Sequence, residues 1–235
     1  MHEEGEKQYS TSTIVLIAAL NEEKGIRHTL AELKKNVKNA KLLVVDGNSS
    51  DQTVRIAEGL GAEVLHQEGR GKGDAINFAL QNINNDFDYA VLTDADYTYP
   101  AKYIPQMIAI LESNPQLGMI CGNRFNSHFH TEWMSNMFYL GNRMLALTHN
   151  LLNGVDMRDP LTGLRVIRWE ILKNWQPKSK GFDIEAEMNY HVESEGYGIQ
   201  EIDIEYRPRI GDKKLKIYHG FNILKRMISE ITINS

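Results

Sequence analysis

Two aspartates, Asp94 and Asp96, lie one residue apart in the segment YAVLTDADYTYP, which runs from Tyr89 to Pro100. The apolar run before them is typical of a buried strand, so both acids are expected at the carboxyl end of that strand. Two carboxylates this close repel each other unless a cation neutralises them, and hard oxygen ligands select Mg²⁺ or Mn²⁺. Such an ion would bridge the protein to a diphosphate, and at an effective dielectric near 20 each unit-charge contact at 4 Å contributes roughly 4 kcal/mol. The pair predicts a metal-assisted site for a nucleotide diphosphate.

The same pair has a simpler interpretation. Asp-x-Asp occurs often by chance, and Asp96 would then only cap the helix expected after Pro100. The elements around the pair decide between the two interpretations.

Four apolar runs alternate with helical patterns in the N-terminal half. The runs are Thr13–Leu20, Lys41–Asp46, Ala62–Gln67 and Tyr89–Asp94, and the helical patterns are Glu22–Val37, Thr53–Leu60 and Lys72–Leu80. Continuous apolar runs are typical of parallel strands covered on both faces, so we predict an α/β fold with a mostly parallel central sheet and helices on both faces. Ligands of such sheets bind outside the carboxyl ends of the strands. That edge would collect Asn21, Asp46, the glycine-rich helix start Gly69–Gly73, which is a ready anion site, and Asp94.

The C-terminal half adds further elements. We predict a helix from Pro100 to about Ser113, a strand in GMICGNRF, a long amphipathic helix over 133–153, a strand at Leu164–Arg168, a helix at Ile184–Glu195, a strand at Gln200–Arg207 and a last helix at Phe221–Ile233. In helix 133–153 apolar residues recur at spacings of three and four, which fits either a core face or a face lying among lipid headgroups. We predict a disordered tail over 1–12, one domain over 13–218 and a C-terminal amphipathic helix over 219–235.

The composition limits the class of protein. The 235 residues are 42% hydrophobic and 24% charged, as in soluble globular domains. A net charge of -5 argues against a nucleic-acid binder. A single cysteine, Cys121, excludes an internal disulfide and suits a reducing compartment. The polar N-terminus is no signal peptide, and no apolar run approaches the roughly 18 to 20 residues that span a bilayer. We expect a cytoplasmic protein that is soluble or peripheral to a membrane.

Eight motifs follow one another in the order and spacing of a family 2 glycosyltransferase with the GT-A fold. They are VLIAALNEE, VVDGNSSDQT, GRGKGDAINFAL, VLTDADYTYP, GNRF, DPLTGLRV, GFDIEAEM and YRPRIGDKKL. The last four resemble the branch of dolichyl-phosphate or polyprenyl-phosphate sugar synthases, which includes dolichyl-phosphate mannose synthase. The resemblance covers about Thr13 to Gly220. It implies a Rossmann-like, nucleotide-diphospho-sugar transferase fold and a hexosyltransferase that uses a UDP- or GDP-sugar, with Mg²⁺ or Mn²⁺ as cofactor.

The resemblance also implies donor-binding residues. These are Ala18, Leu20 and Glu22 in the first nucleotide-contacting segment, Asp46 at the nucleoside, Asp94 and Asp96 at the metal and sugar phosphate, and Arg209 and Lys214 in a basic loop that closes over the diphosphate. Lys72, in the glycine-rich segment, is a further candidate donor contact. The sequence departs from the family where Ala18 replaces a proline and Thr98 replaces a glutamine, and Gly47 stands where mannose synthases often have a second acid.

The candidate catalytic residues are Asp94, Arg124, Arg143 and Asp159. The resemblance implies that Arg124 clamps a phosphate, and Arg143 is a candidate for the acceptor phosphate on the polar side of helix 133–153. Asp159 has the alternatives of acting as a cap or of pairing with Arg165. The histidines His128, His130, His149 and His191 lack zinc-like spacing, so we interpret them as structural.

The motif order implies an inverting transfer to a polyprenyl phosphate. A phosphate monoester has a second pKa near 6, so its oxygen is already nucleophilic at neutral pH and the protein needs only to orient it. A hydroxyl (glycan) acceptor is the alternative. It would require a general base, for which Asp159, Asp183 and Glu185 are the candidates.

Three other classes of protein fit parts of the pattern. Asp94, Asp96 and Thr98 also match the first motif of haloacid-dehalogenase-like phosphatases, but that motif normally opens its domain. A sugar nucleotidyltransferase would carry a glycine-rich, basic loop after the first strand, where this chain has AALNEE. A non-catalytic sugar-nucleotide binder stays open, as does a homo-oligomer.

The last helix carries Lys225 and Arg226, which could meet anionic headgroups. We expect peripheral attachment at the cytoplasmic face of a membrane.

Overall fold

The structure, a computed structural model, describes residues 12–125, 157–212 and 223–226. The predicted tail over 1–12, except Ser12, and the predicted helix over 133–153 lie outside these residues. So does most of the C-terminal helix, of which 223–226 are described and helical.

The described residues form one seven-stranded sheet in the order β3-β2-β1-β4-β6-β5-β7. The strands are β1 (Thr13–Ala19), β2 (Lys41–Asp46), β3 (Glu63–His66), β4 (Tyr89–Asp94), β5 (Leu117–Asn123), β6 (Arg165–Arg168) and β7 (Gly198–Asp203). Neighbours pair in parallel, except that β6 runs antiparallel to both β4 and β5. The prediction of a mostly parallel sheet is confirmed.

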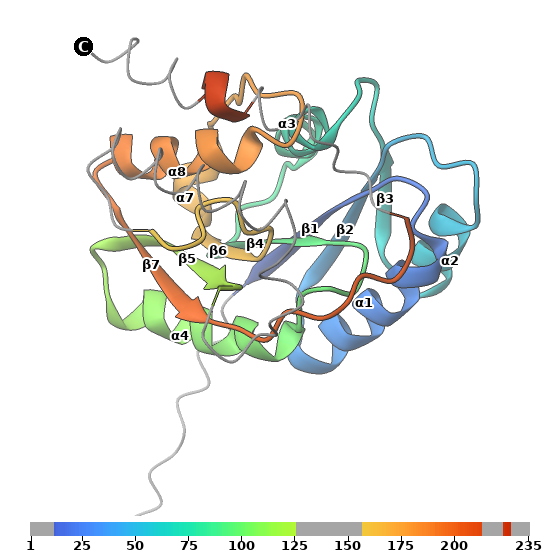
Figure 1. The fold of residues 1–235 in the computed structure, drawn as a ribbon, viewed down its shortest axis with the longest axis horizontal. Coiled ribbons are helices and arrows are strands. Elements are labelled where there is room, and N and C mark those ends of the chain that lie inside the picture. The colour runs from blue at the N-terminus through green and yellow to red at the C-terminus, as the bar shows by residue number, and fades with distance from the viewer. Residues whose placement is uncertain (1–11, 126–156, 213–222, 227–235) are drawn as a thin grey trace, which may run out of the picture.

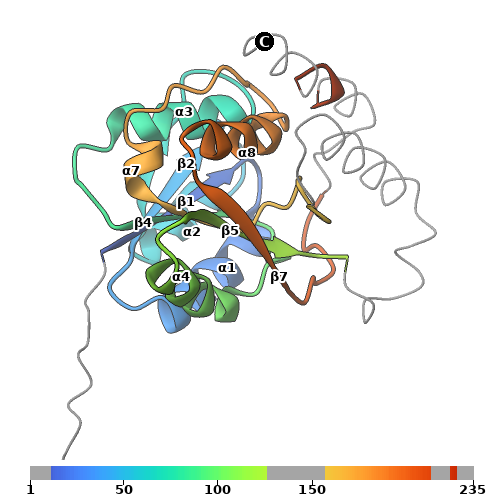
Figure 2. The same ribbon diagram turned by 90° about the vertical axis from the view of Figure 1, so that its left-hand side faces the viewer.

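Helices cover both faces of the sheet (Figures 1 and 2). Their bounds are α1 (Glu23–Asn36), α2 (Thr53–Gly59), α3 (Lys72–Asn82), α4 (Ile104–Ser113) after a short 3₁₀ turn η1 (Ala101–Tyr103), α7 (Trp169–Leu172) and α8 (Ile184–Ser194). One core cluster joins α1, α2 and α4 to the alternate strand residues of one face. A second joins α3, α7 and α8 to the opposite face. Both faces of the strands are therefore buried, which explains their continuous apolar sequences.

The first crossover shows how the sequence produces this packing. Ile26, Leu30 and Leu33 recur on one side of α1 at helical spacing and are almost completely buried against the sheet. β1 and β2 run parallel in register, with Ala19 opposite Asp46, so their carboxyl ends reach the same edge. Asp94 pairs with Ala18 at that edge.

The structure differs from the expectations at three points. The last predicted strand, Gln200–Arg207, is β7 at Gly198–Asp203, because the chain beyond it hydrogen-bonds to a loop instead of the sheet: Arg207 N–H donates to the carbonyl of Thr98 at 3.0 Å. Helix α7, four residues long, was not predicted. Asp96 does not cap the helix after Pro100, since its carboxylate accepts from the backbone and hydroxyl of Thr98.

Helix α1 fixes the turn that contains Asp94 and Asp96. Thr29 Oγ1 donates to the carbonyl of Ala95 at 3.2 Å and accepts from Tyr97 N–H at 3.1 Å. A Cβ at Gly25 would lie 2.7 Å from both Ala95 O and Asp96 Cα, so only glycine lets the helix approach this closely.

We predict that Gly25→Ala displaces this turn and lowers the free energy of unfolding by about 1–3 kcal/mol, because the added methyl meets backbone atoms that cannot rotate away. The matched control is Gly59→Ala in α2, where a Cβ would meet nothing within 4 Å, and which we expect to be neutral or stabilising by up to about 1 kcal/mol. Urea denaturation compares the two. Equal stability of both variants would contradict the predicted close packing.

Candidate active site

Asp94 lies at the carboxyl end of β4 and shares a lysine with α8. Lys72 Nζ, from the first turn of α3, is 2.6 Å from Asp94 Oδ1 and 2.7 Å from Glu185 Oε1. Burial alone would lower the pKa of Lys72, but the charges of Asp94 and Glu185 raise that pKa above its ordinary value. Burial would likewise raise the pKa of Asp94, but the charge and hydrogen bond of Lys72 hold it below its ordinary value. Lys72 and Asp94 are therefore both charged at neutral pH.

Asp96 is more buried than Asp94. The Asp96 side chain is 4% exposed against 32% for Asp94. Its Oδ1 accepts from Thr98 N–H at 3.1 Å and from Thr98 Oγ1 at 2.6 Å. Burial and the charge of Asp94 raise the pKa of Asp96 above its ordinary value. Thr98, which replaces the family's glutamine, thus orients the second acid.

Arg209 bridges two acids across the site. Its Nη1 lies 2.7 Å from Asp96 Oδ2, and its Nη2 pairs with Glu22 Oε1. The backbone delivers it there, because Ile210 N–H donates to the carbonyl of Asp96 at 3.1 Å. Arg209 Nε is buried and has no hydrogen-bond partner among the described residues.

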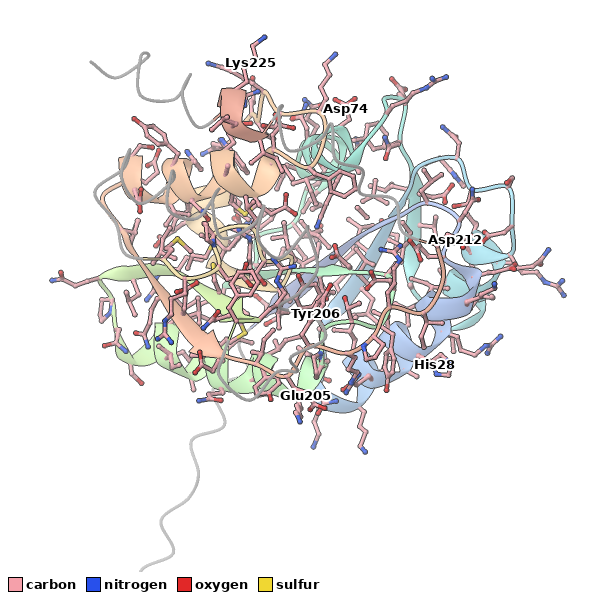
Figure 3. The ribbon with its side chains drawn as sticks, in the orientation of Figure 1. His28, Asp74, Glu205, Tyr206, Asp212 and Lys225 are labelled. Atoms are coloured by element: carbon pink, nitrogen blue, oxygen red, sulfur yellow. The ribbon has the colours of Figure 1, made fainter. Side chains whose placement is uncertain are left out.

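Arg124 and Asp159 form a bidentate pair behind the turn. Arg124 follows β5, and its Nε and Nη2 donate to the two oxygens of Asp159 at 2.6 and 2.7 Å. Asp159 also accepts from Arg124 N–H at 3.0 Å. The guanidinium carbon lies 5.4 Å from the centroid of Tyr206, which Figure 3 labels near the middle of the molecule. The alternative that Asp159 pairs with Arg165 is wrong, since Arg124 occupies both of its oxygens.

The glycine-rich start of α3 is not an open anion site. Gly73 N–H donates to the carbonyl of Gly181 at 3.1 Å, and Asp74 N–H donates to that of Lys180 at 3.2 Å. Two of the helix's N-terminal N–H groups are thus taken by the loop that leads into α8. The contact of Lys72 with a diphosphate stays a prediction for its side chain, which lies at Asp94.

The residues predicted to bind the nucleoside lie at the carboxyl ends of β1 and β2; they are Ala18, Leu20 and Asp46. Asp46 is 1% exposed, and its carboxylate accepts from Ser49 N–H at 3.0 and 3.3 Å. His66 Nδ1 lies 3.4 Å from Asp46 Oδ2. Ala18 is half-buried, whereas Leu20 is 43% exposed at the sheet edge. Leu20 is therefore accessible at the sheet edge, whereas the Asp46 side chain is buried.

The structure places the predicted residues in three sets of ion pairs, which are Lys72 with Asp94, Arg209 with Asp96 and Glu22, and Arg124 with Asp159. Arg143 and Lys214 lie outside the described residues. Sequence reasoning missed the ion pair of Glu185 with Lys72, and Glu201, which accepts from the N–H groups of Arg158 and Asp159 at 2.7 Å each. Acid–base pairs at long separation leave no spacing signal by which they could be found.

The charges of the site fit a divalent cation. Among the described residues these ion pairs join five carboxylates (Glu22, Asp94, Asp96, Asp159 and Glu185) to three cations (Lys72, Arg124 and Arg209), which leaves an excess of two negative charges. No group of three metal-ligating side chains occurs in the described part of the chain. Mg²⁺ is commonly held by one or two carboxylates plus substrate phosphates, so Asp94 and Asp96 suit an ion that arrives with a diphosphate.

The sequence model of glycosyl transferase family 2 matches residues 14–175. The chain belongs to this family, and the predicted family, GT-A fold and enzymatic activity as a glycosyltransferase are confirmed. The alternative of a haloacid-dehalogenase-like phosphatase is not favoured by the match.

Two relatives come from Haloferax volcanii. A dolichyl-phosphate hexose transferase is 31% identical over 222 residues, with 93% of each chain covered. The glycosyltransferase AglJ is 32% identical over 170 residues, and the alignment spans 72% of this chain and 55% of AglJ.

The fold resembles that of glucosyl-3-phosphoglycerate synthase from Mycobacterium tuberculosis. Its complex with Mn²⁺, UDP-glucose and phosphoglyceric acid superposes with a TM-score of 0.75 at 19% identity, covering 96% of this chain and 81% of the synthase. The same protein has been crystallised with Mg²⁺ and UDP.

We predict that Mn²⁺ alone binds weakly, because Lys72 and Arg209 already neutralise Asp94 and Asp96. Lys72→Met and Arg209→Met should each strengthen binding of Mn²⁺ without nucleotide by roughly tenfold or more, since an unpaired carboxylate contact is worth roughly 4 kcal/mol at an effective dielectric near 20. Lys102→Met is the control, because Lys102 pairs with the exposed Glu205 away from the site. Electron paramagnetic resonance of free Mn²⁺ measures the affinity, and unchanged binding in both site variants would refute the prediction.

Proposed function

We propose that the chain is an inverting hexosyltransferase that moves a sugar from a UDP- or GDP-sugar to a polyprenyl or dolichyl phosphate. The Haloferax relative supports the hexose and the class of acceptor by its name. One observation favours a phosphate acceptor over a hydroxyl: each of the three candidate general bases is already paired with a cationic side chain.

The three candidate bases are Asp159, Glu185 and Asp183. Asp159 is held by Arg124, and Glu185 by Lys72. Asp183 Oδ2 lies 3.4 Å from Arg226 Nε, and its Oδ1 accepts from Gly181 N–H. A general base must lie within hydrogen-bond reach of the proton that it accepts, and in each of these carboxylates at least one oxygen already contacts a cationic side chain. A phosphate monoester needs no base, since its second pKa lies near 6.

In the proposed reaction the acceptor phosphate oxygen attacks the anomeric carbon from the face opposite the departing nucleoside diphosphate. Arg124 orients that phosphate: its Nε and Nη2 hold Asp159, so Nη1 is the donor left for the acceptor. Arg143 is a second proposed contact. On the donor side Lys72, Arg209 and Lys214 stabilise the charge that builds on the diphosphate.

Asp94 and Asp96 would hold Mg²⁺ or Mn²⁺. When bound, the ion supplies Lewis-acid stabilisation of the leaving diphosphate. The two surplus negative charges of the ion pairs at the site support this assignment, as do the Mn²⁺ and Mg²⁺ complexes of the structural neighbour. Glu22, Leu20, Ala18 and Asp46 form the proposed nucleotide end.

A polyprenyl acceptor is a lipid, so the enzyme would act at a membrane surface. We propose peripheral attachment at the cytoplasmic face. No helix among the described residues is long and apolar enough to cross a bilayer. Lys178, Lys180 and Lys225 are exposed near the start of α8, and Lys225 extends outward at the upper edge of Figure 3. Basic residues near an anionic membrane contribute about 1 kcal/mol each. Co-flotation with liposomes containing anionic lipid tests the attachment, and a protein that remains in the soluble fraction would rule it out.

The transfer itself predicts a specific pattern of activity. Nucleoside diphosphate release from a UDP- or GDP-sugar with Mn²⁺ should depend on added polyprenyl phosphate, and Asp94→Asn should lower kcat by roughly 10²-fold or more, because charge stabilisation of the leaving group is lost. Asp88→Asn is the matched control at the opposite end of β4, where the Asp88 carboxylate accepts hydrogen bonds from the backbone N–H and the hydroxyl of Ser12.

The outcome that contradicts this function is release that depends on a hydroxyl acceptor and not on the phosphate. A thermal-shift comparison of UDP- and GDP-sugars selects the base, since tenfold tighter binding at saturating ligand adds about 1.4 kcal/mol of stability.

A further inference from the structure

Arg165, the first residue of β6, is completely buried, yet no carboxylate pairs with it among the described residues. Its Nε donates to the carbonyl of Thr162 at 2.9 Å and its Nη2 to that of Pro160 at 2.6 Å. Its Nη1 donates to Asn189 Oδ1 on α8. A buried cation is costly unless its hydrogen bonds are complete, so this guanidinium is held by neutral oxygens that only its planar fork can reach together.

The two carbonyls belong to one turn, residues 159–163, which connects two parts of the site. At its start Asp159 holds Arg124 through both oxygens. At its end Gly163 lies against Asp94, so closely that a Cβ there would be 2.7 Å from Asp94 Oδ2. Arg165 binds between these two ends.

Asn189 completes the frame. Its Nδ2 donates to the carbonyl of Pro160 at 2.9 Å, so the same oxygen receives hydrogen bonds from Arg165 and from α8. Helix α8 also carries Glu185, which pairs with Lys72. Arg165 therefore connects the turn to α8, the helix whose Glu185 holds the lysine that pairs with Asp94.

We propose that Arg165 is a positioning residue of the transferase: it fixes the 159–163 turn so that Asp159 orients Arg124 toward the acceptor while Gly163 packs against Asp94 on the donor side. The proposal rests on the proposed function for the identity of the acceptor. It requires that Arg165 act through Asp159 and not merely through general stability.

The chain offers a matched control on the same strand. Arg168, the last residue of β6, also donates to backbone carbonyls, those of Leu117 at 2.8 Å and Leu111 at 2.6 Å, but at the end of the strand away from the site. Arg165→Lys and Arg168→Lys remove the same fork from the same strand. Both should lower the Tm by several degrees, so a loss of Tm does not distinguish them.

Catalysis and coupling distinguish them. At a temperature where both variants are folded, we expect Arg165→Lys to lower kcat and raise the KM for polyprenyl phosphate, each by roughly tenfold, whereas Arg168→Lys stays within about twofold of the parent, because coupling is confined to residues that share partners. In an Asp159→Asn background, adding Arg165→Lys should change kcat and KM little further. Adding Arg168→Lys should still produce its own small change in kcat and KM.

Binding of Mn²⁺ with UDP or GDP, measured by calorimetry, adds a readout that needs no acceptor. We expect Arg165→Lys to weaken it several-fold through the contact of Gly163 with Asp94. The parent enzyme could fail to use polyprenyl phosphate while the binding effect persists and Arg165 and Asp159 remain coupled in nucleotide release with another acceptor. In that case the proposed acceptor is wrong and the positioning role stands. Fully additive effects of Arg165→Lys and Asp159→Asn, or equal losses in the Arg165 and Arg168 variants, overturn the positioning role.

Discussion

Mutual repulsion among carboxylates is the constraint on which the site depends. Asp94, Asp96, Glu22, Asp159 and Glu185 meet in a small volume with three cations of the chain. Each cation touches a different part of this acid cluster, and together they leave two negative charges in excess. The described residues thus carry a net negative charge at the site without enclosing a metal ion, and under the proposed function a diphosphate completes the coordination of that ion.

The fold delivers these charges from distant parts of the chain. β4 supplies Asp94, and α1 holds the turn after it through Thr29. The segment after β7 returns to the same turn and carries Arg209 to Asp96. The parallel sheet makes this possible, because strands of one direction end at one edge.

The antiparallel strand β6 has a different role. It places the turn 159–163 beside β4 and β5, so that Arg124 and Asp94 are joined through one short piece of chain. The same short piece of chain therefore contacts both Asp94 and Arg124, and under the proposed function it holds the donor side and the acceptor side in a fixed geometry.

Much of the fold could be predicted from the sequence, because strands buried on both faces have continuous apolar sequences and α1 has a clear helical period. The direction of β6 could not, since a four-residue strand carries no sign of its orientation, and α7 is too short for a period to show. Within the site, motif order located Asp94, Asp96 and Arg209 at one edge. It did not reveal that Arg124 pairs with Asp159, that Glu185 holds Lys72, or that loop carbonyls close the start of α3, because these contacts join residues far apart in the sequence.

The most direct test of the account is a crystal of the protein with Mn²⁺ and a sugar nucleotide, with diffraction recorded for the anomalous signal of manganese. The account predicts one peak at about 2.1 Å from an oxygen of Asp94 or Asp96 and from oxygens of the diphosphate, with Arg209 turned from Asp96 toward the phosphates. A bound nucleotide whose diphosphate lies away from both aspartates, with no manganese peak beside them, would contradict it.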